Sequence, residues 1–125
     1  MQDLEPWLRV ADVAERYRIS NYTVREWLRR GRLRGRVVAG RWVTTWDAVF
    51  LFEGRLTPPT GSQRQDAKTP LYTVPDIAAH LRVSEESVRR RLRDGRIAGR
   101  RIAGAWYADR RALADALLDG APTFA

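Results

Sequence analysis

Residues 73–95, TVPDIAAHLRVSEESVRRRLRDG, are the stretch that decides the fold. Thr73 can cap a helix and Pro75 suits the first turn of one, so a helix is expected to begin here. Ser84 is placed to cap a second helix, and Gly95 is placed to end it. The stretch therefore predicts two short helices separated only by a tight turn.

The pattern changes after Gly95. Residues 97–102 and 105–108 are typical of two short strands, and Ala103-Gly104 between them is typical of a tight hairpin turn. Residues 109–118 predict a third helix, capped by Asp109. Its Ala112, Leu113, Ala116 and Leu117 are expected to face inward.

The same unit occurs earlier in the chain. When the sequence is shifted by 64 residues, residues 7–51 align with residues 71–115 without a gap, and 17 of the 45 pairs are identical. The first copy is expected to contain helices at 12–17, 21–30 and 47–52 and a hairpin at 37–42. Residues 54–70 hold three prolines and two glycines and predict a semi-extended linker. The predicted organisation is one domain at 1–53, the linker at 54–70, a second domain at 71–120 and a tail at 121–125.

Composition excludes several classes of chemistry. The chain has 125 residues, no cysteine and one histidine, His80, so no Cys/His metal site or His-based catalytic triad can be assembled. We therefore expect no catalytic residues, no metal and no cofactor. The longest apolar run, residues 48–52, is far shorter than the roughly 20 residues of a membrane span. No signal segment is visible either, so the sequence favours a soluble, cytoplasmic protein.

Charge points to an anionic partner. Lys and Arg number 23 against 15 Asp and Glu, giving a net charge of +8 and an isoelectric point of about 11.1. Lys68 is the only lysine, so the other cations are arginines, whose guanidinium groups fork onto phosphates and guanine edges. Each copy carries a net charge of +3. Arginine-rich helices of this kind are typical of polyanion binders, although many are only solvated surfaces.

Each copy resembles the small winged helix-turn-helix unit of the excisionase and MerR-type DNA-binding family. The resemblance rests on an ordered set of motifs: the Asp-apolar-Ala of the first helix, Arg-apolar-Ser-x-x-Ser/Thr-Val-Arg, Leu-Arg-x-Gly-Arg-apolar, and a Gly-x-x-x-x-Gly-x-Trp hairpin. It implies a mainly α fold with small β-hairpin wings, as two winged helix-turn-helix domains in tandem. Unlike MerR-type regulators, the chain shows no long dimerisation helix.

The resemblance implies sequence-specific binding to double-stranded DNA without catalysis. The role expected from it is that of an excisionase-like recombination directionality factor, or a small transcriptional regulator, of a phage or mobile element. An integrase or another DNA-bound protein would then be a further partner, and a monomer could act as a pseudo-dimer. Two alternatives stay open: a DNA-packaging protein like a small terminase subunit, and a protein-interaction module on the same scaffold.

In the first copy the second helix would enter the major groove, and Val24 and Leu28 would face the core. The residues expected to contact DNA from the other face are Asn21, Tyr22, Arg25 and Arg29. Arg25 could fork onto guanine and Asn21 onto adenine. The hairpin adds Arg36 and Arg41, and Arg41 directly after the glycine of the tip predicts deeper insertion of this wing.

In the second copy the corresponding helix residues are Glu86, Arg89, Arg90 and Arg93, and the hairpin adds Arg100 and Arg101. Glu85 and Glu86 could accept from cytosine amino groups or support the helix dipole. One unit alone should bind weakly, whereas two on one chain raise the effective concentration of the second. The tandem order favours direct-repeat half-sites, and an imperfect inverted repeat stays open.

Overall fold

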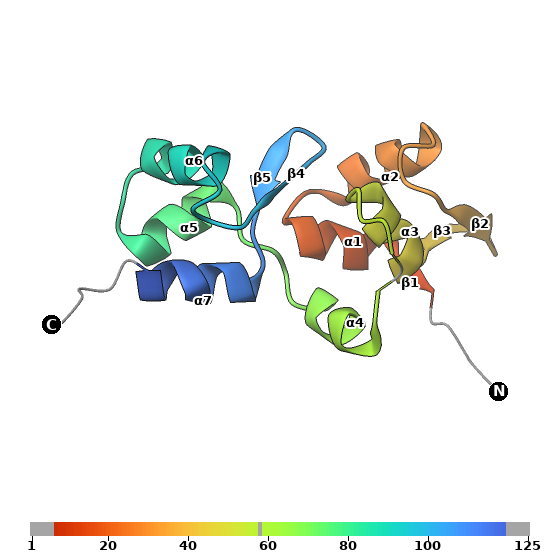
Figure 1. The fold of residues 1–125 in the computed structure, drawn as a ribbon. Coiled ribbons are helices and arrows are strands. Elements are labelled where there is room, and N and C mark those ends of the chain that lie inside the picture. Colours follow the sequence, from red (N-terminus) through yellow and green to blue (C-terminus); the bar gives the residue numbers. More distant parts are fainter. Residues whose placement is uncertain (1–6, 58, 120–125) are drawn as a thin grey trace, which may run out of the picture. The chain divides into compact units, whose positions relative to one another are not determined.

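A computed structural model describes residues 7–57 and 59–119. The chain divides into two compact units, with the boundary between Pro70 and Leu71. We call them unit 1 and unit 2 and describe each by itself. Both are mainly helical, and each carries a small antiparallel hairpin (Figure 1).

Unit 1 contains a three-stranded sheet and four helices. Its strands run in the order β1-β3-β2, and both pairings are antiparallel. Val37 pairs with Trp42 across the hairpin, whose tip is Ala39-Gly40 as the sequence predicts. The elements are β1 (Leu8–Arg9), α1 (Val10–Tyr17), α2 (Asn21–Arg29), β2 (Arg36–Val38), β3 (Arg41–Thr44), α3 (Trp46–Phe52) and α4 (Gly61–Ala67).

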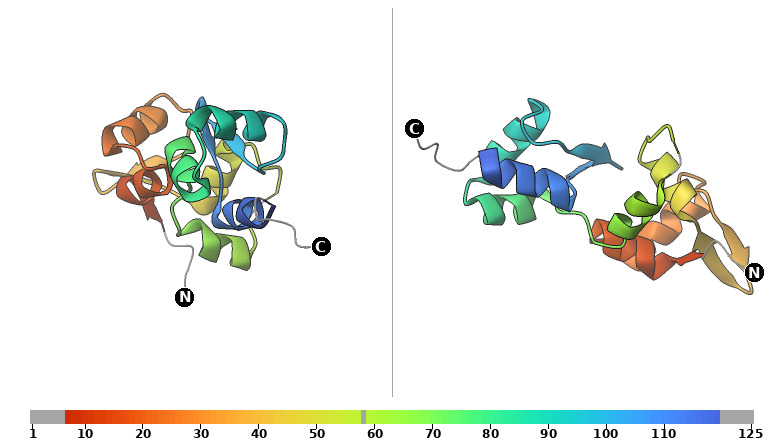
Figure 2. Two further views of the ribbon diagram at one scale, coloured as in Figure 1. Left: turned by 90° about the vertical axis from the view of Figure 1, so that its left-hand side faces the viewer. Right: turned by 60° about the horizontal axis from the view of Figure 1, so that its bottom comes forward.

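Unit 2 repeats the order of unit 1 from the first strand to α3, but its first strand is reduced to a single bridge. A single antiparallel bridge between Tyr72 and Ala108 stands where unit 1 pairs Leu8 with Thr44, at the same positions of the repeat. The hairpin extends away from the helices of the unit (Figure 2). The elements are α5 (Val74–Leu81), α6 (Glu85–Arg93), β4 (Arg100–Ile102), β5 (Ala105–Tyr107) and α7 (Arg110–Asp119).

The helix starts confirm the predicted caps. The hydroxyl of Ser20 accepts from the backbone N–H of Thr23 at 3.2 Å, and that of Ser84 accepts from Ser87 at 3.1 Å. Thr73 caps α5 in the same way, and Asp109 accepts from the backbone of Ala112 at 2.8 Å. Each bond satisfies a backbone donor that has no partner inside its helix.

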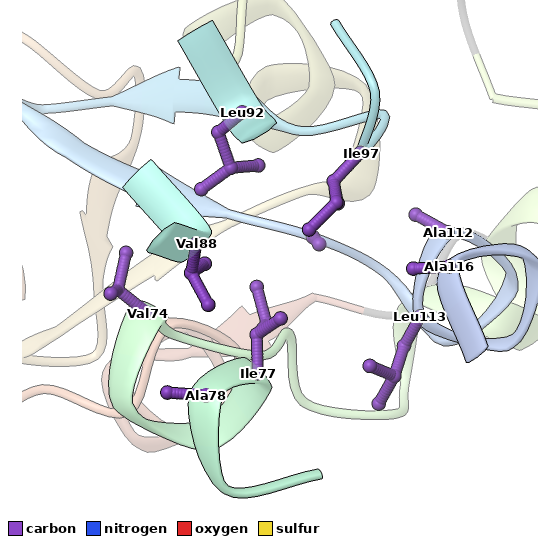
Figure 3. Packing of buried hydrophobic residues seen from close by; sticks show 10 residues of the cluster. Val74, Ile77, Ala78, Val88, Leu92, Ile97, Ala112, Leu113 and Ala116 are labelled. Atoms are coloured by element: carbon purple, nitrogen blue, oxygen red, sulfur yellow. The ribbon is translucent and has the colours of Figure 1, made fainter. Parts of the chain in front are cut away.

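A cluster of small and branched side chains forms the core of unit 2. Ile77 of α5, Val88 and Leu92 of α6, Ile97 after α6, and Leu113 of α7 belong to this one buried cluster (Figure 3). Ala112 and Ala116 are buried there too, as predicted. Leu117 is not: it is 45% exposed, which corrects the expectation that it faces inward. The cluster ends at Ala116, so the last turn of α7 runs past the core.

Aromatic side chains fill the core of unit 1. The Trp27 ring packs edge-on against Tyr17, with centroids 5.6 Å apart, and lies 4.8 Å from the ring of Phe52. Trp27 stands where unit 2 has Arg91, so the two cores differ in content although their helices and hairpins follow the same order.

The structure differs from the sequence-based expectation in the segment 54–70. It contains the helix α4 where a semi-extended linker was expected, and the segment belongs to unit 1. Thr60 and Gln63 cap α4 reciprocally, since each side chain accepts from the backbone N–H of the other residue at 3.0–3.1 Å. Ala67 at the end of α4 is buried, 4% exposed. The prolines flank this helix at positions 58, 59 and 70 rather than interrupting it.

Candidate nucleic-acid interface

The second helix of unit 1, α2, buries one face and exposes the other. Val24, Trp27 and Leu28 are buried. Tyr22 and Arg25 are exposed at a spacing of three, and Arg29 follows four residues later, so the three form one stripe. Asn21 lies exposed beside the stripe at the first turn. The structure thus brings all four predicted residues of this helix to its solvent face.

Arg25 and Arg29 differ in their surroundings. Arg29 donates to Glu26 at 2.5 Å, and Arg30 lies 3.4 Å from the same carboxylate. The hydrogen bond with Arg29 is the main cause that lowers the pKa of Glu26, and the same bond raises the pKa of Arg29. Within residues 7–57 and 59–119, Arg25 makes no ion pair. Arg25 is therefore available to an external anion without breaking a contact.

The matching helix of unit 2, α6, presents a stripe at the same positions: Glu86, Arg89 and Arg93. Arg89 pairs with Glu85 at 3.2 Å, and Arg93 lies 3.5 Å from Glu86. All four side chains are about half exposed or more. Exposed pairs of this kind contribute about 1 kcal/mol or less, so a phosphate or base can displace them. Arg90 is exposed next to this stripe.

The hairpins end in strained, narrow turns. Ala39 and Gly40 both have positive φ, 52° and 78°, and Ala103 and Gly104 follow with 51° and 85°. Two successive positive φ values are the geometry of the two-residue type I′ turn, which matches the twist of the strands. Each tip therefore consists of two residues with small side chains, alanine and glycine.

The hairpin arginines face different sides. Arg36 and Val38 are two residues apart on β2 and so point to the same face of the sheet. Arg41 is directly opposite Val38 on β3, so Arg36 and Arg41 share this face. Arg100 and Arg101 are neighbours on β4 and so point to opposite faces. Arg101 donates to the carbonyl of Gly104 at 3.2 Å and lies 5.7 Å from the Trp106 ring. Arg36 similarly lies 5.3 Å from the Trp7 ring centroid.

A glycine joins each helix to its hairpin. A Cβ added to Gly35 would stand 2.5 Å from Cδ2 of Leu28 on α2 and 2.6 Å from the carbonyl oxygen of Val43 on β3. One added to Gly99 would collide with Leu92 of α6. At both positions the backbone lies so close to the leucine of the second helix that a Cβ does not fit. This explains why both copies have glycine here.

A comparison with known protein families finds a match in each of the two units. A family model described as helix-turn-helix domain matches residues 7–43 and 71–120, more than half of the chain. The chain belongs to the helix-turn-helix domain family. No significant match was found among curated proteins or among solved structures.

The helix-turn-helix matches coincide with the features described above. The first ends within β3, after α1, α2 and most of the hairpin, and the second runs from Leu71 to the end of α7. Helix-turn-helix domains bind DNA through their second helix. Membership therefore supports DNA binding, and α2 and α6 occupy the place of the second helix in the two matched segments.

Two exposed arginines stand at the helix-turn-helix turns, outside the set of residues expected to contact DNA. Arg18 ends α1 and Arg82 ends α5, both in the left-handed conformation with φ of 56° and 57°. They are identical in the repeat and precede the caps of α2 and α6 by two residues.

Two other kinds of site are absent from the described part of the chain. In residues 7–57 and 59–119, no three His, Cys, Asp or Glu side chains gather where they could hold a metal ion. None of the helices described there is long and apolar enough to cross a lipid bilayer.

Proposed function

We propose that this protein is a sequence-specific, non-catalytic double-stranded DNA-binding protein in which both helix-turn-helix units contact one duplex. The observation that carries the proposal is the repetition of one exposed stripe, Tyr22-Arg25-Arg29 in unit 1 and Glu86-Arg89-Arg93 in unit 2, on the helix that reads DNA in this family. Different residues at the first position of the stripe give the two units different preferences for bases.

The proposed mechanism divides positioning from base reading. The N-terminal turns of α2 and α6 lie in the major groove, where Arg25 and Arg89 donate to guanine edges and Asn21 pairs with adenine. The hairpins place Arg41 and one of the two β4 arginines against the backbone or the minor groove. Arg29 and Arg93 exchange their intrahelical carboxylate partners for phosphates, and Arg89 exchanges Glu85 for the guanine edge. These exchanges cost little, because the pairs are exposed.

The biological role proposed is that of an excisionase-like recombination directionality factor or a small transcriptional regulator. In the first case, an integrase or another DNA-bound protein would occupy the neighbouring site. Two units on one chain supply two reading helices, so the proposal has a monomer bind as a pseudo-dimer.

Selection of bound sequences from random duplex DNA tests the proposal. The expected result is one enriched motif with two spaced halves. Arg25→Ala and Arg89→Ala should each weaken binding to that motif by about 1–3 kcal/mol and relax the preference at one base pair. Arg111→Ala is the matched control: it removes the same charge from the exposed surface of α7, which is a different helix from α6 (Figure 1), and should change affinity far less. Absence of any enriched motif would contradict the proposal.

A further inference from the structure

The chain that joins the two units is shorter than its sequence indicates. Of residues 54–70, helix α4 occupies Gly61–Ala67 and belongs to unit 1. The backbone bridge that anchors the chain in unit 2 is at Tyr72, which exchanges two hydrogen bonds with Ala108 at 2.8 and 3.0 Å. Only residues 68–71 lie between these two attachments.

A buried ionic cluster holds α4 on unit 1. The guanidinium of Arg16, on α1, donates from Nε to Glu53 at 2.7 Å and from Nη1 to the carbonyl oxygen of Ala67 at 3.2 Å. Glu53 also accepts from the hydroxyl of Tyr17 and from Nε of Arg55. The side chains of Arg16 and Glu53 are 3% and 0% exposed. One buried charge therefore ties the end of α4 to the end of α3.

A second contact holds α4 one turn before Ala67. Arg64 donates to the carboxylate of Asp47, on α3, at 2.8 Å. Ala67 is buried while Gln65 and Lys68 are exposed, so α4 is attached by its last turn and by this ion pair.

The cluster is a property of unit 1 alone. At the repeat positions of Arg16, Tyr17 and Glu53, unit 2 has His80, Leu81 and Leu117. His80 is exposed and its Nδ1 lies 2.8 Å from the carbonyl oxygen of Asp76, within its own helix. Unit 2 folds without the ionic cluster, so the winged unit itself does not require it. The copy that carries the cluster is the one from which the connecting segment leaves.

We propose that the docking of α4 sets the spacing of DNA half-sites, with Arg16 and Glu53 as positioning residues. This inference rests on the proposed function, since it concerns two units on one duplex. When α4 is docked, the free connection runs over five residue-to-residue intervals, from Ala67 to Tyr72. Fully extended, these intervals span at most about 17 Å. If the chain were free from Arg55 onward, seventeen steps could span about 60 Å.

The consequence is a restricted set of target sites. Half-sites one helical turn apart are separated by about 34 Å, and one further turn adds the same distance. A short tether allows both units to bind at few separations, whereas a long one tolerates many. Loss of simultaneous binding removes an avidity gain of about 10²–10⁴-fold.

Affinity measured against a panel of duplexes with different spacers tests this inference. The panel varies the spacer between the two selected half-sites from the favoured length to one helical turn longer. For the natural chain, affinity should fall by about 100-fold or more over this range. Gln65→Pro, which removes a backbone donor inside α4 and clashes with its first turn, should reduce the fall to within a few-fold. Gln65→Ala is the matched control, because position 65 is exposed and alanine retains the helix.

Hydrogen exchange and a lengthened tether complete the test. Hydrogen exchange of the amides of residues 64–67 reports whether Gln65→Pro has released α4. If it has not, a ten-residue Gly-Ser insertion after Thr69 lengthens the tether directly and should flatten the spacer profile in the same way. An unchanged profile with released α4 or the inserted tether overturns the inference and leaves the proposed function standing. If Arg25→Ala and Arg89→Ala both fail to weaken binding, the proposed function fails, and the spacing inference with it.

Discussion

Glu53→Gln is expected to destabilise unit 1 severely. The carboxylate of Glu53 is completely buried and receives hydrogen bonds from Arg16, Tyr17 and Arg55. The amide keeps the shape of the side chain but removes its charge, which leaves the guanidinium of Arg16 buried without a counter-ion. Breaking a buried pair in this way costs about 3–5 kcal/mol. Small domains have about 5 kcal/mol of stability at the lower end of the range, so most of unit 1's stability is at stake.

A double substitution separates the charge effect from packing. Arg16→Met with Glu53→Leu removes both charges and keeps apolar side chains of similar size at the two buried positions. Replacing a buried ion pair by apolar residues of similar size is often neutral, so the double variant should recover more than half of the loss. Asp47→Asn is the control for an exposed pair, and its effect should stay within about 1 kcal/mol.

Urea unfolding followed by tryptophan fluorescence measures these differences. Trp27 and Trp46 are buried in unit 1, and the only tryptophan of unit 2 is Trp106, so the signal reports mainly on unit 1. The reasoning is refuted if Glu53→Gln shifts the free energy of unfolding no more than Asp47→Asn does. Recovery in the double variant by less than a third would also contradict it.

Three other predictions concern the hairpin contact, the alkaline limit and base reading. Gly35→Ala should cost about 1–3 kcal/mol in urea unfolding, because its Cβ meets Leu28 and Val43, while Gly61→Ala, in open space, should cost nothing. Burial raises the pKa of Tyr17, so the neutral phenol contributes stability that is fully present below about pH 10 and is lost as the pH rises further; Tyr17→Phe should flatten this alkaline fall, and an equal slope in both proteins would refute the assignment. Glu86→Gln should lose about 1–3 kcal/mol of discrimination at one cytosine, whereas Glu85→Gln should leave base preference unchanged; higher affinity with the same preference would show that Glu86 only supports the helix.

Local signals were sufficient to predict the helices and hairpins of the two repeated copies. Ser20 and Ser84 cap their helices where the Ser-x-x-Ser/Thr pattern indicated, and both hairpin tips fall on the predicted Ala-Gly pairs. These features depend on residues within a few positions of each other, so periodicity and turn chemistry reveal them. The repeat strengthened each assignment, because two copies had to agree.

The connecting segment was harder to predict because its structure depends on a distant partner. Thr60-Gly-Ser-Gln63 carries the pattern of a capping box, but a seven-residue helix is unstable alone. The end of α4 is held by the hydrogen bond that Arg16, 51 residues earlier in the chain, donates to the carbonyl oxygen of Ala67. No local pattern indicates a contact of that range. Arg16 itself was indistinguishable in the sequence from the surface arginines around it.

Of the candidate interface, the sequence predicted which side chains are exposed but not how they are paired. Arg25 and Arg29 both lie on the solvent face of α2, yet only Arg29 is engaged by Glu26. The partners of Arg89 and Arg93 follow from spacings of four and seven residues, and such pairs form only where rotamers allow it. Arg100 and Arg101 were grouped together, although alternation along β4 places them on opposite faces.

Footprinting on the selected duplex is the most direct test of the claim that both units read one DNA molecule. The natural chain should protect two separate stretches on one duplex. Arg25→Ala should abolish protection of one stretch first as the protein is diluted, and Arg89→Ala the other. A single protected stretch that responds to only one of the two substitutions would contradict the account.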